Sequence, residues 1–302
     1  MNNMRKIAFI GSALGYGAQN YSTSLGPKYI KEKYDIVKKL NNLFVESYWY
    51  DTVRIKKASF DHIPGRGKNY QVVLRHTKKL NLTIKKFLSN KNSGFPVIIG
   101  GDHSCAIGSW TGMMEALDAN KKYGLIWIDA HMDAHTLKTS PSKAYHGMPI
   151  SFLLGYNTEI FQLSQMQISP NNLIIIGARS FEKEEEKMLH SLQVRIFYID
   201  EVQKKGLKQV FEESVLLASK GTKSFGISLD LDAIDPQDAP GVGSRVQNGL
   251  SWLELKDNLP IIFSNPNLSA LEIMEFNPKL DIDDKTAEII LQIILSLGRC
   301  LS

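Results

Sequence analysis

The chain is poor in cysteine and has no long apolar run. Its 302 residues include two cysteines, Cys105 and Cys300, which excludes a disulfide framework and a C-x-x-C metal site. No stretch approaches the roughly 20 apolar residues that a membrane-spanning helix needs. The net charge is only +5 and no run of five basic residues occurs, so we expect neither a nucleic acid nor a membrane as a partner. These features favour a reducing compartment, and we expect a cytoplasmic protein.

The chain also lacks a linker. No Pro/Ser-rich segment, repeat or low-complexity stretch divides it, and its 43% hydrophobic and 22% charged residues are ordinary for a globular protein. The apolar stretch 7–14 follows Arg5 and Lys6. It is short and lacks an A-x-A cleavage pattern, so we predict a buried first strand rather than a signal peptide. We expect residues 1–302 to form a single domain, a size that can bury a substantial core.

Short apolar runs alternate with longer amphipathic ones along the whole chain. The short runs show little polar alternation, which is typical of strands covered on both faces. The predicted strands are residues 6–10, 44–49, 96–99, 125–129, 173–177, 195–199, 224–231 and 270–275. The predicted helices are residues 27–40, 71–88, 106–120, 182–192, 207–219, 252–264 and 286–297. Pro27 suits a first helical turn, and Ser251, with Glu254 three residues on, is a predicted N-cap.

This alternation of strands and helices predicts one α/β domain. Its sheet would be predominantly parallel, with helices on both faces. Eight strands could also close into a barrel, and periodicity alone does not distinguish the two arrangements.

Acidic and histidine residues follow three of the predicted strands. The carboxyl ends of parallel strands meet at one edge of a sheet, where α/β proteins place their sites. Side chains two residues apart in an extended segment also point the same way. The residues concerned are Asp102 and His103 after strand 96–99, Asp129, His131 and Asp133 at the end of strand 125–129 and just beyond it, and Asp230 and Asp232 at the end of strand 224–231 and just beyond it.

Clustered carboxylates need a partner, because a buried carboxylate without one is costly. Four of them would balance two divalent cations, and a water that bridges two such cations loses its proton readily. Two imidazoles with four oxygen ligands favour Mn²⁺, although histidine also suits Zn, Co or Fe. A single D-x-D at a strand end is more often a loop or cap feature. Gly-Gly-Asp-His, Asp-Ala-His-Met-Asp and Asp-Leu-Asp on three separate strands are hard to reach by chance, and we predict a binuclear metal site.

Five motifs follow one another over nearly the whole chain. They are Gly-Gly-Asp102-His103-Ser, Asp129-Ala-His131-Met-Asp133, His146-Gly-Met-Pro, Ser228-Leu-Asp230-Leu-Asp232-Ala-Ile-Asp235-Pro and Glu272-Ile-Met-Glu275-Phe-Asn-Pro. In this order they resemble the signature motifs of the arginase/agmatinase (ureohydrolase) family, and the chain is most similar to arginase. The resemblance implies a three-layer α/β/α sandwich with a central eight-stranded parallel sheet rather than a barrel.

The resemblance also implies a cofactor of two Mn²⁺ ions per chain. Asp129 and Asp230 would bridge the ions, which would share a hydroxide that attacks the guanidinium carbon of the substrate. The implied ligands are His103, Asp129, Asp133 and Asp230 for one ion, and His131, Asp129, Asp230 and Asp232 for the other.

Catalytic roles follow from the same resemblance. Glu275 would hold the guanidinium by a charge-assisted hydrogen bond, and Asp133 would stabilise the tetrahedral intermediate. His146 would carry protons, a role suited to a group that titrates near neutrality. Asp102 and Glu272 are interpreted as groups that support the metal ligands.

The loop between Asp133 and His146 bears on the substrate. In arginases this loop binds the α-carboxylate of arginine, and Thr139, Ser140 and Ser142 resemble its hydroxyl-bearing run. Agmatinases, whose substrate has no carboxylate, generally lack that run. His135 stands where arginases commonly have Asn and can still donate to a carboxylate, whereas Ala144 removes a contact.

A second segment resembles the part of the family that meets the substrate's α-amino group. Glu182 replaces the usual Asp there, and Glu185 aligns with a second acidic position. The charged run 182–187 could also be a solvated helix start. The stretch 243–248 departs from the family's Gly/Pro-rich pattern, which leaves the shape of that pocket wall open.

These observations favour an arginase-type hydrolase that converts L-arginine to L-ornithine and urea. An agmatinase or an enzyme acting on another guanidino acid is the main alternative. A non-catalytic metal-binding member of the family is a further one. By resemblance we also expect a homo-oligomer, either a trimer or a hexamer.

Overall fold

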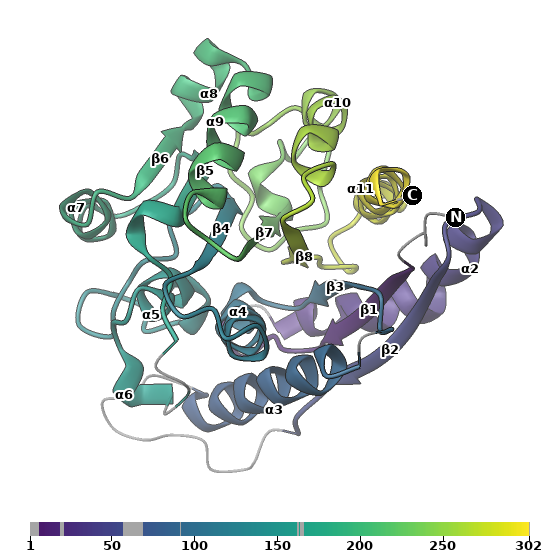
Figure 1. The fold of residues 1–302 in the computed structure, drawn as a ribbon, viewed down its shortest axis with the longest axis horizontal. Helices are drawn as coiled ribbons and strands as arrows, with labels where there is room; N and C mark the ends of the chain where they lie inside the picture. Colours follow the sequence, from purple (N-terminus) through teal and green to yellow (C-terminus); the bar gives the residue numbers. More distant parts are fainter. Residues whose placement is uncertain are drawn as a thin grey trace.

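A computed structural model describes residues 6–18, 21–56, 69–90, 92–161, 163 and 166–301. Its centre is an open sheet of eight parallel strands in the order β2-β1-β3-β8-β7-β4-β5-β6, with β2 and β6 at the edges (Figure 1). The strands are β1 (Ile7–Ser12), β2 (Ser47–Val53), β3 (Phe95–Gly100), β4 (Tyr123–Ile128), β5 (Leu173–Ala178), β6 (Arg195–Tyr198), β7 (Ser224–Asp230) and β8 (Leu268–Met274). All eight predicted strands are present. The sheet is not a barrel.

Helices cover both faces of the sheet, so the fold is the expected three-layer α/β/α sandwich. Helices α3, α4 and α5 lie on one face, and α9, α10 and α11 lie on the other (Figure 1). The α-helices are α1 (Gly26–Lys28), α2 (Ile36–Asn42), α3 (Tyr70–Leu88), α4 (Ala106–Ala116), α5 (Pro149–Leu153), α6 (Thr158–Phe161), α7 (Lys183–Ser191), α8 (Ile199–Lys205), α9 (Leu207–Ser219), α10 (Trp252–Phe263) and α11 (Lys285–Cys300).

The strands contribute side chains to two separate hydrophobic cores, one on each face of the sheet. In β4, Leu125 and Trp127 pack with α3 and α4, whereas Ile126 and Ile128 belong to the core under α9 and α10. Successive side chains of a strand point to opposite faces, and both faces are buried here. This explains why the strands read as continuous apolar runs rather than alternating ones.

Two predicted elements near the start of the chain differ in the structure. The helix predicted at residues 27–40 is interrupted: a π-helical turn spans Tyr29–Lys33, and α2 begins only after Asp35, whose φ of 52° breaks the helical path. Strand β2 starts three residues later than predicted, because α2 continues to Asn42 and Phe44 has a φ of 63°. Pro27 does lie in the first turn of α1, as expected.

Ser251 immediately precedes α10, but its side chain makes no capping hydrogen bond. The carboxylate of Asp238 accepts the N–H of Trp252 instead, at 2.9 Å. The short helices α5, α6 and α8 have no counterpart among the predicted ones, because segments this short carry too little periodicity. In the part of the chain that the structure describes, no helix combines the length and the apolar character that crossing a membrane requires.

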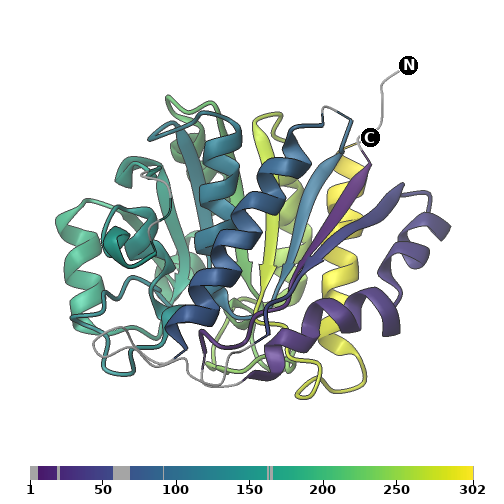
Figure 2. The same ribbon diagram turned by 90° about the horizontal axis from the view of Figure 1, so that it is seen from below.

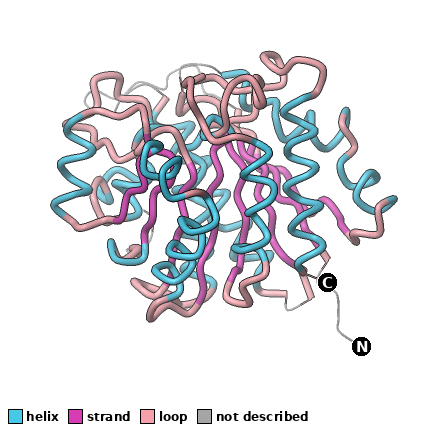
Figure 3. The backbone as a smooth tube through the Cα atoms, turned by 90° about the horizontal axis from the view of Figure 1, so that it is seen from above, coloured by secondary structure: helices cyan, strands magenta, loops and turns pink. Residues whose placement is uncertain are grey.

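The functional loops gather at one edge of the sheet. All strands are parallel, so their carboxyl ends share that edge, which is the lower one in Figure 2 and the upper one in Figure 3. The four central strands β3, β8, β7 and β4 are consecutive neighbours. The residues that follow them are therefore brought close together.

Candidate metal centre and substrate pocket

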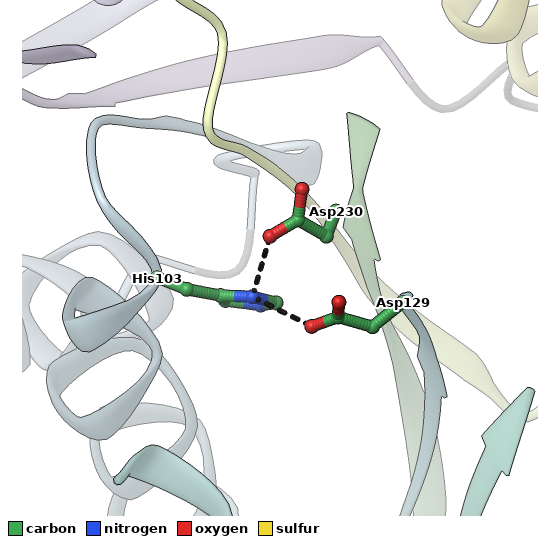
Figure 4. A group of neighbouring side chains, drawn as sticks. All are labelled: His103, Asp129 and Asp230. Atoms are coloured by element: carbon green, nitrogen blue, oxygen red, sulfur yellow. Dashed lines mark ion pairs between the residues drawn. The ribbon is translucent and has the colours of Figure 1, made fainter. Parts of the chain in front are cut away.

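Three of the central strands contribute to one compact group of ligand atoms. His103 follows β3, Asp129 follows β4 and Asp230 ends β7, and their side chains converge in Figure 4. The Nδ1 atom of His103 lies 3.2 Å from Oδ2 of Asp129, 3.0 Å from Oδ2 of Asp230 and 3.3 Å from Oδ2 of Asp133. Two ligand atoms that bind one ion at about 2.1 Å and a right angle lie about 3.0 Å apart. The spacing therefore fits a metal ion.

A second group shares Asp129 with the first. His131 Nδ1 lies 3.4 Å from Oδ1 of Asp129 and 3.3 Å from Oδ2 of Asp232. Asp129 thus turns one oxygen toward each histidine, the arrangement that a bridging carboxylate requires. In both residues Oδ1 also accepts a backbone N–H, that of His131 at 2.7 Å for Asp129 and that of Asp232 at 2.9 Å for Asp230. Asp230 differs because, among the described residues, its carboxylate lies close to one histidine, His103, rather than to both.

The charges of this cluster are not balanced by the protein alone. Burial raises the pKa of Asp133 and Asp230, and repulsion between neighbouring carboxylates raises it further. Burial opposes protonation of His103, yet the nearby carboxylates of Asp129 and Asp230 raise its pKa well above the ordinary value. His103 Nδ1 and Asp232 Oδ1 are buried and make no hydrogen bond within the described residues. Divalent cations would satisfy both atoms and replace the protons that the cluster otherwise attracts.

Neighbouring groups fix the orientation of His103 and Asp129. His103 Nε2 lies 2.9 Å from the hydroxyl of Ser228, which donates to Glu272 at 2.7 Å. This leaves Nδ1 facing the carboxylates. The ring also stacks on Trp127, with 4.0 Å between the centroids, and the indole N–H of Trp127 donates to Asp129 at 2.9 Å. Glu272 therefore supports the ligands, in line with its interpretation from the sequence.

Asp102 accepts hydrogen bonds from backbone N–H groups around the site. Its carboxylate accepts the N–H of Gly17 at 2.9 Å and the N–H of Ser104 at 3.1 Å. The carbonyl of Gly17 in turn accepts the N–H of His146 at 3.2 Å. A Cβ atom at position 17 would lie 2.3 Å from the Asp102 carboxylate, so only glycine fits there. Asp235 has a similar structural role in its own turn, since it accepts the N–H groups of Gln237 and Gly249.

Glu275 lies beside the candidate metal ligands rather than within the strand. Strand β8 ends at Met274, one residue earlier than predicted, and Glu275 has a φ of 63°. The turned backbone directs the carboxylate to the N–H of His103, which donates to Oε1 at 2.9 Å. His146 Nδ1 is 3.7 Å from the same oxygen. Burial lowers the pKa of His146, but the contact with Glu275 outweighs it, and the net pKa is raised.

A pocket of about 260 Å³ opens over this cluster. Its lining includes every candidate catalytic, substrate-binding and metal-ligating residue of the sequence analysis except Asp129 and Thr139. Ser180 and Ser244 were not among the candidates. Ser180 lies two residues before Glu182, and Ser244 lies in the divergent stretch 243–248. The lining residues are His103, His131, Asp133, His135, Ser140, Pro141, Ser142, Ala144, His146, Gly147, Ser180, Glu182, Glu185, Asp230, Asp232, Ser244 and Glu275.

The two serines of the 134–145 loop are arranged as donors. The Ser140 hydroxyl oxygen accepts the N–H of Lys143 at 3.0 Å, and that of Ser142 accepts the N–H of Ala144 at 3.2 Å. Each oxygen is thus fixed by the backbone. The two hydroxyls lie 3.5 Å apart, so one can donate to the other while the second donates to a ligand. Thr139 does not line the pocket and contacts His135 instead.

His135 faces two carboxylates. Its Nε2 lies 3.0 Å from Oε2 of Glu182 and 3.3 Å from Oε2 of Glu185. Glu182 is the N-cap of α7, and Glu185 completes a capping box. Burial raises the pKa of Glu185 to about 8, whereas the hydrogen bond between the two carboxyl groups lowers the pKa of Glu182. The acidic run is therefore both a helix start and part of the pocket.

Arg179 is a residue whose importance the sequence did not reveal. It follows β5, and its guanidinium contacts three segments that surround the site. Its N–H groups donate to the carbonyls of Gly177, Asp232, Ala233, Val246 and Gln247. All five donors of a guanidinium are thereby used, and the divergent stretch is held against the residue pair Asp232–Ala233.

Comparisons with known proteins agree with this geometry. The sequence pattern of the Arginase family matches residues 5–298. Arginase of Staphylococcus aureus (strain COL) is 31% identical over 293 residues, 95% of each chain, and arginase of Bacillus subtilis (strain 168) is 33% identical over 300 residues, 97% of each chain. The structure of arginase from Bacillus caldovelox has a TM-score of 0.88 at 31% identity, covering 98% of each chain. Entamoeba histolytica arginase in complex with L-ornithine has a TM-score of 0.85 at 25% identity, again over 98% of each chain. The chain therefore belongs to the arginase family and is a hydrolase of amidine carbon–nitrogen bonds.

Proposed function

We propose that the protein is a binuclear manganese arginase, which hydrolyses L-arginine to L-ornithine and urea. The observation that carries this proposal is the sharing of Asp129 between two histidine-containing groups, next to Glu275 and His146 in one pocket. His103, Asp129, Asp133 and Asp230 would hold one ion, and His131, Asp129, Asp230 and Asp232 the other. Such ions supply Lewis acidity, which lowers the pKa of bound water.

The protein's own residues would bind the substrate, stabilise the intermediate and transfer the proton. Glu275, held by the N–H of His103, binds the guanidinium by a charge-assisted hydrogen bond. Water adds to the guanidinium carbon, and Asp133 stabilises the tetrahedral intermediate. The bond from that carbon to the side-chain nitrogen then breaks. The leaving nitrogen requires a proton, and His146, beside Glu275, is placed to deliver it.

The far end of the pocket supports an amino-acid substrate. The hydroxyls of Ser140 and Ser142 can donate to an α-carboxylate, and Glu182 and Glu185 offer acceptors to an α-ammonium group. L-ornithine, which the Entamoeba histolytica relative binds, is the product that this reaction would release.

An agmatinase or another guanidino-acid hydrolase is the second candidate. Ala144 contributes no polar group, and both ring nitrogens of His135 are engaged, so serine hydroxyls are the main side-chain donors left for a carboxylate. A non-catalytic role is less well supported, because all six ligands, His146 and Glu275 are present in one site. We also propose a single domain over residues 1–302, a cytoplasmic location and assembly as a homotrimer or homohexamer.

Urea release from a panel of substrates tests the proposal. The purified protein, loaded separately with Mn²⁺, Co²⁺, Fe²⁺ or Zn²⁺, would be assayed with L-arginine, agmatine and 4-guanidinobutyrate. We expect the highest kcat/KM with Mn²⁺ and L-arginine. A preference for agmatine would identify the second candidate instead, and no urea from any substrate with any metal would refute both.

A further inference from the structure

His135 is held rigidly on both sides of its ring. The residue is 6% exposed. Its Nδ1 lies 3.1 Å from the hydroxyl of Thr139, and its Nε2 lies 3.0 Å from Oε2 of Glu182. The backbone is fixed as well, because its N–H donates to the carbonyl of Gly147 and its carbonyl accepts from the hydroxyl of Ser151. The ring has no free nitrogen to turn toward a ligand.

The surroundings assign the tautomer of His135. The ionised carboxylate of Glu182 can only accept a hydrogen bond, so the hydrogen of the neutral ring belongs on Nε2. The Thr139 oxygen accepts the N–H of Thr136 at 2.9 Å, and its proton can donate to Nδ1 at 3.1 Å or to the carbonyl of Thr136 at 3.4 Å. The other nitrogen then carries hydrogen and donates to Glu182, with Glu185 at 3.3 Å as a further acceptor.

Glu182, the hydrogen-bond partner of His135, is exposed to the pocket. The Glu182 side chain is 56% exposed and lines the pocket, whereas Glu185 is buried and accepts the N–H groups of Ala134 and Glu182. A half-exposed glutamate normally samples several rotamers, and its ordering costs conformational entropy. The contacts with His135 and with the carboxyl group of Glu185 restrict that freedom. Among the described residues that line the pocket, none is Lys or Arg, so no cationic side chain neutralises Glu182 there.

We infer that His135 is a positioning residue, which holds Glu182 ready to receive an ammonium group of the substrate and does not itself bind the substrate's carboxylate. This inference rests on the proposed function of the pocket. It assigns the substrate class as a guanidine whose chain carries a protonated amine, such as L-arginine or agmatine. A guanidino acid without an amine would leave Glu182 without a cationic partner and would bring the carboxylate of the substrate close to that of Glu182. The site should therefore reject such a compound.

A double-mutant cycle tests the inference. His135→Ala removes the donor, His135→Gln keeps a side-chain N–H, and Glu182→Gln removes the charge of the receiver. We expect His135→Ala to lower kcat/KM about 10-fold for both L-arginine and agmatine, mainly through KM, the size expected for one hydrogen bond to a charged group. The double variant should be no worse than Glu182→Gln alone, and His135→Gln should restore part of the loss. Glu184→Gln, exposed on the same turn of α7, should change nothing.

Other results would contradict the inference. A loss confined to L-arginine would mean that His135 binds the carboxylate, and additive losses in the double variant would mean that His135 and Glu182 act independently. Calorimetric binding of L-ornithine and putrescine separates this test from the question of catalysis, because it needs no turnover. His135→Ala should weaken the binding of both amines equally, even if the wild-type protein releases no urea. Absence of urea release would contradict the proposed function but not the positioning role of His135. Unchanged affinity for both amines would refute the positioning role.

Discussion

The carboxylate of Glu275 accepts the backbone N–H of His103 at 2.9 Å. The two residues follow the neighbouring strands β8 and β3, and Glu275 reaches His103 because its backbone turns at a φ of 63°. The group proposed to hold the guanidinium is therefore fixed to the backbone of a proposed metal ligand. The position of the substrate carbon relative to the metal site would depend on this main-chain contact rather than on a flexible side chain.

Replacing Glu275 by glutamine separates its two contacts. The amide oxygen of Glu275→Gln can still accept the N–H of His103, so the backbone should keep its position. The charge-assisted hydrogen bond to the guanidinium is lost, and such a bond contributes about 1.5–3 kcal/mol. We expect kcat/KM to fall about 10- to 150-fold with unchanged metal content, measured by urea release and elemental analysis. Loss of metal would instead indicate that the contact with His103 is the main role of Glu275.

Removal of a bridging carboxylate should disturb both ions. Wild-type protein should bind two Mn²⁺ per chain, and Asp129→Ala or Asp230→Ala should lose activity and much of the bound metal, because a buried histidine cluster without its carboxylates holds cations poorly. Elemental analysis after gel filtration provides the measurement. Asp257→Ala, at an exposed position on α10, is the control and should keep both ions. Full activity in either ligand variant would overturn the assignment.

His146 is expected to act on kcat rather than on metal binding. It lies 3.7 Å from Glu275 and outside the two ligand groups. His146→Asn should therefore lower kcat by about 10²- to 10⁴-fold, the usual range for general acid–base groups, while two Mn²⁺ remain bound. A kcat close to that of the wild type would mean that another group delivers the proton.

The sheet is predictable from the sequence because burial on both faces leaves a simple signal. Seven strands coincide with apolar runs, and the edge strand β2 overlaps its predicted run only in part. The polar residues at the ends of three strands are enough to identify His103, Asp129 and Asp230 as candidate ligands. The errors in element boundaries near residues 35, 44 and 275 involve backbone turns with positive φ at Asp35, Phe44 and Glu275. Such turns are infrequent for residues other than glycine, and no periodicity encodes them.

Contacts between segments that are distant in the sequence also could not be predicted. His135 and Glu182 are 47 residues apart, and nothing in the loop composition indicates that they meet. The same holds for Arg179, whose partners are main-chain carbonyls rather than side chains. The sequence could therefore identify which residues line the pocket more readily than it could assign what each of them contacts.

Buried His76 is expected to make the stability of the folded protein sensitive to acid. It is fully buried on α3 with its Nε2 2.9 Å from the Ser12 hydroxyl, and burial, aided by Lys79, lowers its pKa to about 3. The unfolded chain takes up a proton near the ordinary pKa of about 6.5, whereas the folded chain does not until the pH is far lower. The unfolded state therefore binds more protons below pH ~6.5, and stability must fall as the pH drops toward the folded pKa.

Urea denaturation with a chelator present would measure this effect. Between pH ~7.5 and ~5.5 the linkage amounts to about 1.4 kcal/mol of unfolding free energy. His76→Gln cannot titrate, so its stability should fall by about that much less than the wild type's over the same interval. Identical losses in the two proteins would show that His76 does not titrate on unfolding in this range. The chelator ensures that the release of metal at low pH does not contribute.

The discrimination between arginine and agmatine depends on the serine hydroxyls. Ser142 accepts the N–H of Ala144 and lines the pocket, so its proton can donate to an α-carboxylate. A hydrogen bond to a charged group contributes about 1.5–3 kcal/mol, and Ser142→Ala should lower kcat/KM for L-arginine about 10- to 150-fold. Agmatine has no carboxylate, and its kcat/KM should hardly change. The ratio of the two values should therefore shrink in the variant, while the metal content stays constant. Equal losses for both substrates would mean that Ser142 supports the loop without contacting the substrate, because a loop displaced as a whole would affect any guanidine that enters the pocket.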